Sequence, residues 1–226
     1  MEDFGRFLNV VDVEATCWEG RRPKDQVNEI IEVGLCVVDL STRERVERHR
    51  ILVRPERSRV SEFCTELTGL TQDEVDTGVS FPEACALLER EHFSHMRAWT
   101  SWGDYDRKQF ERQAAAVGVR YPFGRRHVNV KVQWSDAHRL PQKIGMAGAL
   151  KHAKLPLEGR HHSGVDDAWN IAALVLRLVE RGDWPTGPRP GAPAPRPAMP
   201  TPQPRASAPR PEESAPQPKA STPRSS

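Results

Sequence analysis

The heptapeptide Val10-Val11-Asp12-Val13-Glu14-Ala15-Thr16 lies at the end of an apolar segment that begins at Phe7. Its apolar character predicts a buried β-strand. Alternate residues of a strand point to the same face, so Asp12 and Glu14 are expected to project together. Burial of two neighbouring carboxylates costs free energy unless cations compensate their charge. The pattern therefore indicates a site for Mg²⁺ or Mn²⁺, which prefer oxygen ligands. Taken alone, it fits a strand edge with two solvated acids equally well.

Strand and helix patterns continue as far as Glu180. Predicted strands cover residues 7–15, 30–40, 46–53, 96–102 and 127–132, and predicted helices cover 61–67, 81–90, 104–117, 134–138, 144–153 and 166–180. Thr71 and Glu74 form a capping-box pattern, which predicts a further helix start. The first three strands predict an antiparallel meander, and helical crossovers around the last two predict parallel pairing. This order is typical of an α/β fold in which helices flank a mixed five-stranded sheet.

The composition divides the chain into a domain of residues 1–184 and a segment of residues 185–226. The first part carries 27 Lys and Arg against 29 Asp and Glu, whereas the second holds 14 of the chain's 20 prolines and a net charge of +4. The Pro-rich segment lacks the apolar surface that would offset its ordering entropy, so a disordered tail with an unknown partner is predicted. A mildly acidic domain does not have the charge of a high-affinity nucleic-acid binder, but it suits acids that bind metal ions and, through them, phosphate.

The remaining global features predict a cytoplasmic protein without membrane contact. The four cysteines show no Cys-x-x-Cys spacing, which disfavours a zinc site or a disulfide framework and suits a reducing compartment. The first residues lack a secretory signal pattern. No apolar run approaches the roughly 20 residues that a membrane-spanning helix needs.

Further acids follow two other predicted elements. Asp104 and Asp106 follow the fourth strand, and an acid at the C-terminal end of a strand lies where α/β sheets commonly bind ligands. Asp104 fits an N-cap, so Asp106 is the better metal ligand. Asp167 falls in the first turn of the last helix, and His162 lies on the loop before it. An imidazole with a pKa near 6.5 suits proton abstraction at neutral pH. Four carboxylates and a histidine together predict phosphodiester hydrolysis with two metal ions.

At this point the sequence resembles the DEDDh 3′–5′ exonucleases, a superfamily that includes ribonuclease T and proofreading subunits and has a ribonuclease H-like fold. The motifs that carry the resemblance are Val11-Asp12-Val13-Glu14-Ala15-Thr16, Trp102-Gly103-Asp104-Tyr105-Asp106 and His162-x4-Asp167. A closer resemblance links the chain to the Eri-1-like histone-mRNA 3′-exonucleases and their bacterial KapD-type relatives. It is carried by the segments 14–17, 53–56, 63–76 and 164–172. The resemblance extends over roughly residues 7–180.

The resemblance implies a role for each matched residue. The metal-binding acids would be Asp12, Glu14, Asp106 and Asp167, with Glu14 also counted among the catalytic residues. His162 would be the general base, because its five-residue interval to Asp167 is that of the family. His161 stands where some relatives have Pro. Phe63, Leu67 and Tyr105 would hold the terminal base, although close relatives often have Trp in place of Tyr105. Ala15 and Thr16 would contact the terminal sugar.

These observations predict a Mg²⁺- or Mn²⁺-dependent 3′–5′ exonuclease that uses two ions and releases nucleoside 5′-monophosphates from single-stranded 3′ ends. The subgroup resemblance favours RNA over DNA. Two alternatives stay open. One is a DNA 3′–5′ exonuclease in repair or proofreading. The other is a non-catalytic regulatory module that has kept the nuclease fold and recruits partners through the tail, although the intact set of acids and histidine argues against it.

Overall fold

The computed structural model of the chain describes residues 5–185. The predicted Pro-rich tail therefore lies, apart from Pro185, outside the described residues, and the division of the chain at residue 184 stays a prediction. No helix in the described part is long and apolar enough to cross a membrane.

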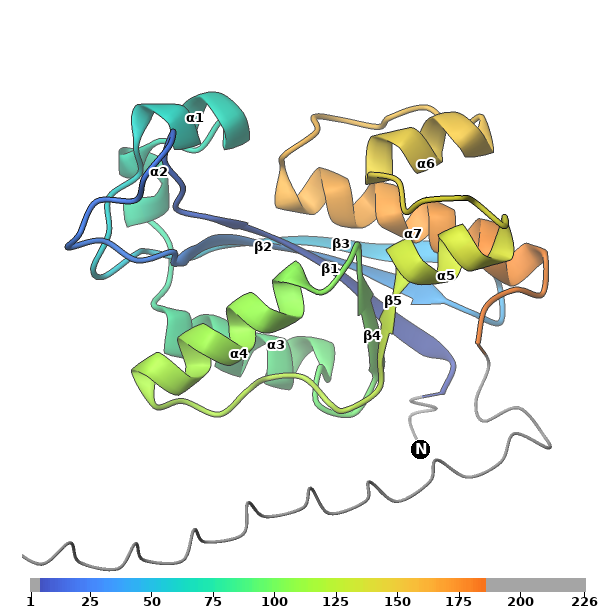
Figure 1. Cartoon of the computed structure of the whole chain (residues 1–226). Coiled ribbons are helices and arrows are strands. Elements are labelled where there is room, and N and C mark those ends of the chain that lie inside the picture. The colour runs from blue at the N-terminus through green and yellow to red at the C-terminus, as the bar shows by residue number, and fades with distance from the viewer. Residues whose placement is uncertain (1–4, 186–226) are drawn as a thin grey trace, which may run out of the picture. The chain divides into compact units, whose positions relative to one another are not determined.

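A mixed five-stranded sheet forms the centre of the fold (Figure 1). Its strands are β1 (Phe7–Ala15), β2 (Ile30–Asp39), β3 (Glu44–Leu52), β4 (Ala98–Ser101) and β5 (His127–Asn129), in the order β3-β2-β1-β4-β5. β2 pairs antiparallel with both β1 and β3. β4 pairs parallel with both β1 and β5. The predicted meander and the predicted parallel half of the sheet are therefore both confirmed.

Helices cover both faces of the sheet (Figure 1). They are α1 (Glu62–Thr68), α2 (Gln72–Asp76), α3 (Phe81–His92), α4 (Tyr105–Val117), α5 (Val130–Ala137), α6 (Met146–Ala153) and α7 (Gly164–Glu180). One face packs against α5, α6 and α7, and the other packs against α3 and α4. Helices α1 and α2 pack in a smaller cluster around Ile31 of β2. The predicted helix start at Thr71 is confirmed, since the Thr71 side chain accepts a hydrogen bond from the Glu74 backbone N–H at 3.2 Å. The Glu74 carboxylate does not complete a capping box but pairs with Arg50 at 2.8 Å.

Alternation along β1 assigns its side chains to the two cores. Leu8 and Val10 pack with α7, whereas Val11 and Val13 pack with α3 and α4. β1 and β2 are buried along almost their whole length, which explains their nearly continuous apolar sequences. β3 is an edge strand, and its many charged residues are typical of edges that must not pair with other chains.

The fifth strand is shorter than predicted. The sequence suggested a strand over residues 127–132 and a helix over 134–138, but β5 ends at Asn129 and α5 begins at Val130. Asn129 accepts a hydrogen bond from the backbone N–H of Val132 at 3.1 Å through its side chain and so caps the helix. The apolar residues after it face the core from a helix rather than from a strand, a choice that periodicity cannot make over so few residues.

Candidate active site

The first two acids of the site come from β1. Asp12 and Glu14 continue the row of Leu8 and Val10, so they point to the face of the sheet that α7 covers. Near its C-terminal end β1 is no longer covered by packed apolar side chains on this face. Both carboxylates therefore line an open cavity of about 370 Å³.

The third acid, Asp167, is brought to the first two by a very close approach of α7 to the sheet. Gly34 of β2 pairs with Asp12 in the sheet register. A Cβ atom on Gly34 would lie 2.0 Å from the backbone carbon of Gly164, the first residue of α7. The helix can therefore begin directly above the sheet only because residue 34 has no side chain. As a result, Asp12, Glu14 and Asp167 offer ligand atoms that all lie within 4.8 Å of one another.

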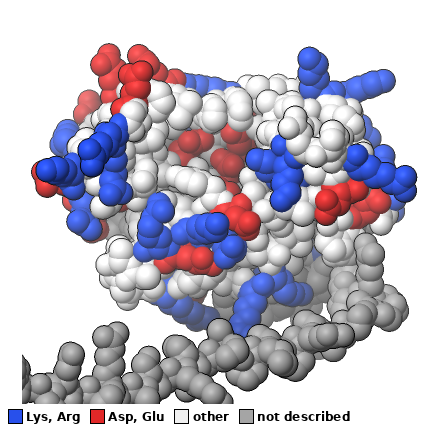
Figure 2. All heavy atoms as spheres, viewed as in Figure 1, with Lys and Arg blue, Asp and Glu red and all other residues white. Residues whose placement is uncertain are grey.

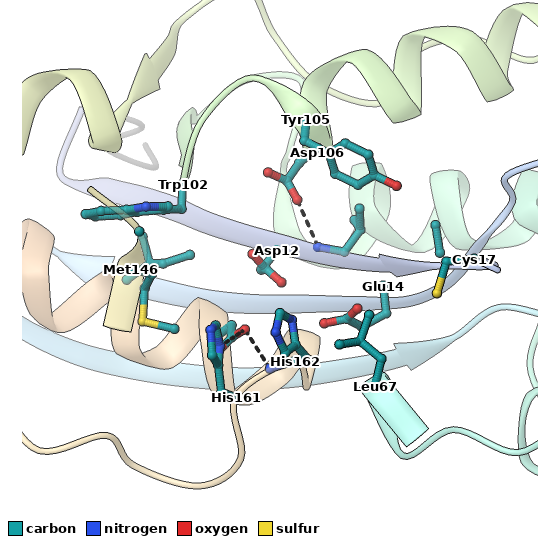
Figure 3. Close-up of a pocket in the computed structure, with 15 residues that line it drawn as sticks. Asp12, Glu14, Cys17, Leu67, Trp102, Tyr105, Asp106, Met146, His161 and His162 are labelled. Atoms are coloured by element: carbon teal, nitrogen blue, oxygen red, sulfur yellow. Dashed lines mark hydrogen bonds and ion pairs between the residues drawn. The ribbon is translucent and has the colours of Figure 1, made fainter. Parts of the chain in front are cut away.

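The fourth acid, Asp106, comes from the first turn of α4 on the other side of β1. Its Oδ1 atom accepts a hydrogen bond from the backbone N–H of Val13 at 3.0 Å, and its side chain lines the same cavity (Figure 3). Asp104 occupies the N-cap position as expected, although its side chain makes no cap hydrogen bond and instead pairs with Arg107 at 3.4 Å. Asp106 is thus the acid of this motif that reaches the cavity.

Both histidines before α7 line the cavity. Their rings stack with centroids 4.0 Å apart. The His161 Nδ1 atom lies 3.0 Å from Oδ2 of Asp167, and the backbone N–H of His162 donates to the same oxygen at 3.0 Å. His162 adopts a left-handed backbone conformation with φ of 63°, which is uncommon for a residue with a side chain. The imidazole of His162 is directed toward Asp12 and Glu14 (Figure 3). The imidazole of His161 is held by Asp167.

Acidic side chains are recessed in a hollow at the centre of this face, and Lys and Arg side chains lie on the rim around it (Figure 2). Burial and mutual repulsion in the hollow favour the protonated acids. Burial is the main cause that raises the pKa of Glu14 to about 8 and that of Asp106 to about 6. The same cause raises the pKa values of Asp12 and Asp167. Four carboxylates that repel one another in a shared cavity fit divalent cations, which would remove this penalty.

The predicted substrate-binding residues fall into two groups. Ala15, Leu67 and Tyr105 line the carboxylate cavity. Phe63 instead lines a neighbouring cavity with Trp18 and Arg21.

Thr16 is fully buried and is not among the residues that line the cavity. Its hydroxyl donates to the carbonyl of Val27 at 2.9 Å and accepts from the backbone N–H of Glu29 at 2.9 Å. The side chain therefore holds the loop between β1 and β2, and the sugar contact of Thr16 stays a prediction.

Glu32 is the main residue of the site that the sequence analysis did not identify. It lies directly opposite Glu14 in the sheet and is almost completely buried. Its Oε1 atom accepts from the backbone N–H of Val165 in the first turn of α7 at 3.1 Å and lies 3.4 Å from Nε of Arg50. Glu32 thus anchors the start of α7 beside the site. The sequence feature that could have identified Glu32 is that it is a single acid inside the apolar run of β2. Cys17, Trp102 and Met146, which also line the cavity, had no comparable signal.

With this geometry in hand, the chain can be compared with known proteins. The exonuclease family model named RNase T matches residues 10–175. The chain belongs to this exonuclease family. It is 29% identical over 193 residues to the 3′-5′ exoribonuclease 1 of Rattus norvegicus, a match that covers 80% of this chain and 55% of the rat protein. It is 30% identical over 198 residues to the 3′-5′ exonuclease Snipper of Drosophila melanogaster, which covers 78% of this chain and 70% of the fly protein.

A solved structure shows the same architecture. The crystal structure of the nuclease domain of 3′hExo, a DEDDh family member bound to rAMP, matches with a TM-score of 0.73 and 28% identity. This match covers 80% of this chain and 96% of that domain. The chain spans about half the length of the mammalian exoribonucleases that it matches. The resemblance to the DEDDh exonucleases of the Eri-1-like group and the ribonuclease H-like fold are confirmed.

Proposed function

We propose that the protein is a divalent-metal-dependent 3′–5′ exonuclease that removes nucleoside 5′-monophosphates one at a time from single-stranded 3′ ends. The observation that carries this proposal is the convergence of four acids in one cavity. They come from β1, α4 and α7, elements that are distant in the sequence. No structural role accounts for this arrangement, because the acids destabilise one another in the absence of cations.

The acids Asp12, Glu14, Asp106 and Asp167 would hold two Mg²⁺ or Mn²⁺ ions. Such ions, when bound, supply an activated water and stabilise the charge that develops on the leaving oxygen. The proposed ligands are all carboxylates, which suits these hard cations better than softer ones. A pair of ions also explains why four carboxylates are gathered, since one ion needs fewer negative charges.

His162 would accept the proton of the attacking water. Its imidazole faces the carboxylates from a loop, and among residues 5–185 no side chain or backbone group forms a hydrogen bond with either ring nitrogen. Nδ1 of His161, by contrast, is held by Asp167. Leu67 and Tyr105 lie on the cavity wall, where they would pack against the terminal base without reading its identity. Phe63 would reach that base only from the neighbouring cavity.

RNA is the proposed substrate class. The support is the similarity to proteins described as 3′-5′ exoribonucleases and to a nuclease domain that binds rAMP, the ribonucleoside monophosphate expected as a product. Residues 1–184 would form the nuclease domain. A cytoplasmic location and a partner for the Pro-rich tail are proposals that follow from the sequence alone.

The test compares two neighbouring acids that differ only in where they point. Asp167 lines the cavity, whereas Asp166 pairs with Arg48 and accepts from the backbone N–H of Arg160 at 2.8 Å. The Asp167→Asn, Asp166→Asn and wild-type proteins are each incubated with 5′-labelled single-stranded RNA or DNA, in Mg²⁺, Mn²⁺ or EDTA. Circular dichroism verifies that all three are folded.

We expect a ladder that shortens from the 3′ end, requires the metal ion, persists in Asp166→Asn and disappears in Asp167→Asn. Asp12→Ala should abolish cleavage in the same way. The ratio of the RNA and DNA rates decides the substrate class, and a higher rate on DNA would replace the RNA proposal by the repair or proofreading alternative. If folded wild-type protein cleaves neither polymer in Mg²⁺ or Mn²⁺, the proposed nuclease activity is overturned and a non-catalytic binding module is favoured.

A further inference from the structure

A second group of metal-ligating side chains lies on the face of the sheet opposite to the carboxylate cavity. Glu47 and His49 alternate along β3 and pair with Val37 and Leu35 of β2. Both of these β2 residues pack in the core beneath α3 and α4. Glu47 and His49 therefore point toward the same side. His92, the last residue of α3, meets them there.

The three side chains form a compact set. Each offers a ligand atom, and these atoms all lie within 4.8 Å of one another. The rings of His49 and His92 have centroids 4.3 Å apart, and Oε2 of Glu47 lies 2.8 Å from Nε2 of His49. Two imidazoles and one carboxylate thus converge from two elements that are separated by about 40 residues of sequence.

His92 provides an independent indication of a ligand. Its side chain belongs to a residue that is only 6% exposed, and its Nδ1 atom has no hydrogen-bond partner among the residues that the structure describes. Its backbone is fixed, because the carbonyl of His92 accepts from Nδ2 of Asn9 at 2.9 Å. Buried polar atoms without a partner are rare in folded proteins, and a bound ion is one of the few causes.

The cationic side chain near His92, that of Arg97, does not form a hydrogen bond with the Nδ1 atom of His92. The guanidinium of Arg97 lies over the rings of Phe7 and Phe93, at 5.0 and 5.1 Å from their centroids. It is therefore held against aromatic faces rather than against the imidazole. The lone pair of an imidazole nitrogen in this position suits a metal cation.

We propose that Glu47, His49 and His92 bind one late first-row divalent cation, with Zn²⁺ as the best fit, and that this ion joins β3 to the end of α3. Two histidines and one carboxylate are a known Zn²⁺ ligand set, with water as the fourth ligand. Imidazole ligands also favour Zn²⁺ over Mg²⁺, which sets this site apart from the carboxylate cavity.

The ligand atoms of the three side chains already lie near the spacing that such an ion needs. Bonds of about 2.0–2.1 Å in a tetrahedron place the ligand atoms about 3.3 Å apart. The side chains of Glu47 and His49 are 46% and 37% exposed, so they are free to move toward the fixed His92. The bound ion would tie the edge strand of the sheet to a helix of the core and would limit the opening to which edge strands are prone.

The test is a Zn²⁺ titration of the full chain, free of any histidine tag and in excess Mg²⁺. Four proteins are compared by calorimetry and by thermal unfolding: wild type, His49→Gln, Glu47→Gln and His152→Gln. His49 and Glu47 are exposed enough that their substitution should leave the fold intact. His152 is an exposed histidine of α6 outside the cluster, which makes His152→Gln the matched control.

We expect wild type and His152→Gln to bind one equivalent of Zn²⁺ more than His49→Gln does. Glu47→Gln should bind this additional equivalent at least about 10-fold more weakly than wild type. Zn²⁺ should raise the unfolding temperature of wild type and His152→Gln but not that of His49→Gln. Co²⁺ in place of Zn²⁺ should give visible absorption bands that His49→Gln lacks.

The readout is the difference between variants, because Zn²⁺ also binds carboxylates in the cavity of all four proteins. Equal stoichiometry and equal thermal shifts in wild type and His49→Gln would overturn the proposal. So would wild-type protein whose unfolding temperature and Co²⁺ spectrum do not respond to the metal. Cleavage of nucleic acid is not measured here, and the outcome is therefore independent of the proposed nuclease activity.

Discussion

Replacement of Gly34 by Ala tests the idea that a close approach of backbones assembles the site. The added Cβ atom would lie 2.0 Å from the carbon and oxygen of the Gly164 carbonyl group and 2.3 Å from the nitrogen of Val165. Ordinary contacts begin near 3.4 Å, so the start of α7 must move away from the sheet by about 1.4 Å. Neither neighbour is a flexible side-chain end that could rotate aside.

This displacement affects stability and activity to different degrees. Overpacking of this kind costs about 1–3 kcal/mol, which in a domain of this size lowers the unfolding temperature by about 2–4 °C per kcal/mol. Asp167 and His162 move with the helix start, away from Asp12 and Glu14. Because a misplacement of about 1 Å in a catalytic group costs roughly 100-fold in rate, we expect Gly34→Ala to cleave at least about 100-fold more slowly at temperatures where it is folded.

The matched control is Gly148→Ala, the same chemical change in the exposed part of α6. A Cβ atom there would meet only the Ile144 side chain at ordinary distances of 3.7 and 3.9 Å. Because Ala is the better helix former, we expect this variant to gain about 0.5–1 kcal/mol of stability and to keep full activity. Initial rates on labelled single-stranded RNA and unfolding curves by circular dichroism measure both effects. Full activity in Gly34→Ala would refute the assembly argument, whether or not stability falls.

Three further predictions concern the cavity. In EDTA, the pKa values of Glu14 and Asp106, raised mainly by burial to about 8 and about 6, mean that the folded state binds more protons than the unfolded state. The unfolding temperature should therefore rise as the pH falls from 8 to 6, and Mg²⁺ should abolish this rise. An unfolding temperature independent of pH in EDTA would contradict the raised pKa values. His162→Ala should lower kcat by about 10²–10⁴-fold and His161→Ala by much less, and the reverse order would move the base to His161. Tyr105→Ala should raise KM by about 5- to 150-fold, because the terminal base loses its aromatic contact, while Tyr105→Trp should retain binding. An unchanged KM in the alanine variant would show that Tyr105 does not bind the base.

The two adjacent histidines of the site differ in backbone conformation, and only His162 is left-handed. Its backbone N–H donates to Asp167, and its imidazole is directed toward the other acids. His161, with ordinary backbone geometry, is left to hold Asp167 from the side. Two adjacent histidines therefore occupy one cavity wall with different neighbours, which is why only a kinetic comparison of both variants assigns the base.

The sequence alone determined the class of fold and predicted the acids that line the cavity. The apolar segment that contains Asp12 and Glu14 predicted a buried strand with two acids on one face, and the structure has this strand. The order of strands and helices predicted the mixed sheet, because periodicity records which residues face a core. Local hydrogen-bonding side chains were read correctly at Thr71 but missed at Asn129, where the choice between strand and helix depends on a single cap.

Only the tertiary structure decided how the acids meet and which other residues serve them. The contact of Gly34 with Gly164 joins elements 130 residues apart, and no local pattern records such a distance. Glu32 became part of the site only through the sheet register that places it opposite Glu14, and the tertiary structure also shows that the hydroxyl of Thr16 is used within a loop. Residue chemistry and periodicity are local properties that a sequence displays directly, whereas register, close backbone approach and the use of each hydrogen bond are set by the packed chain.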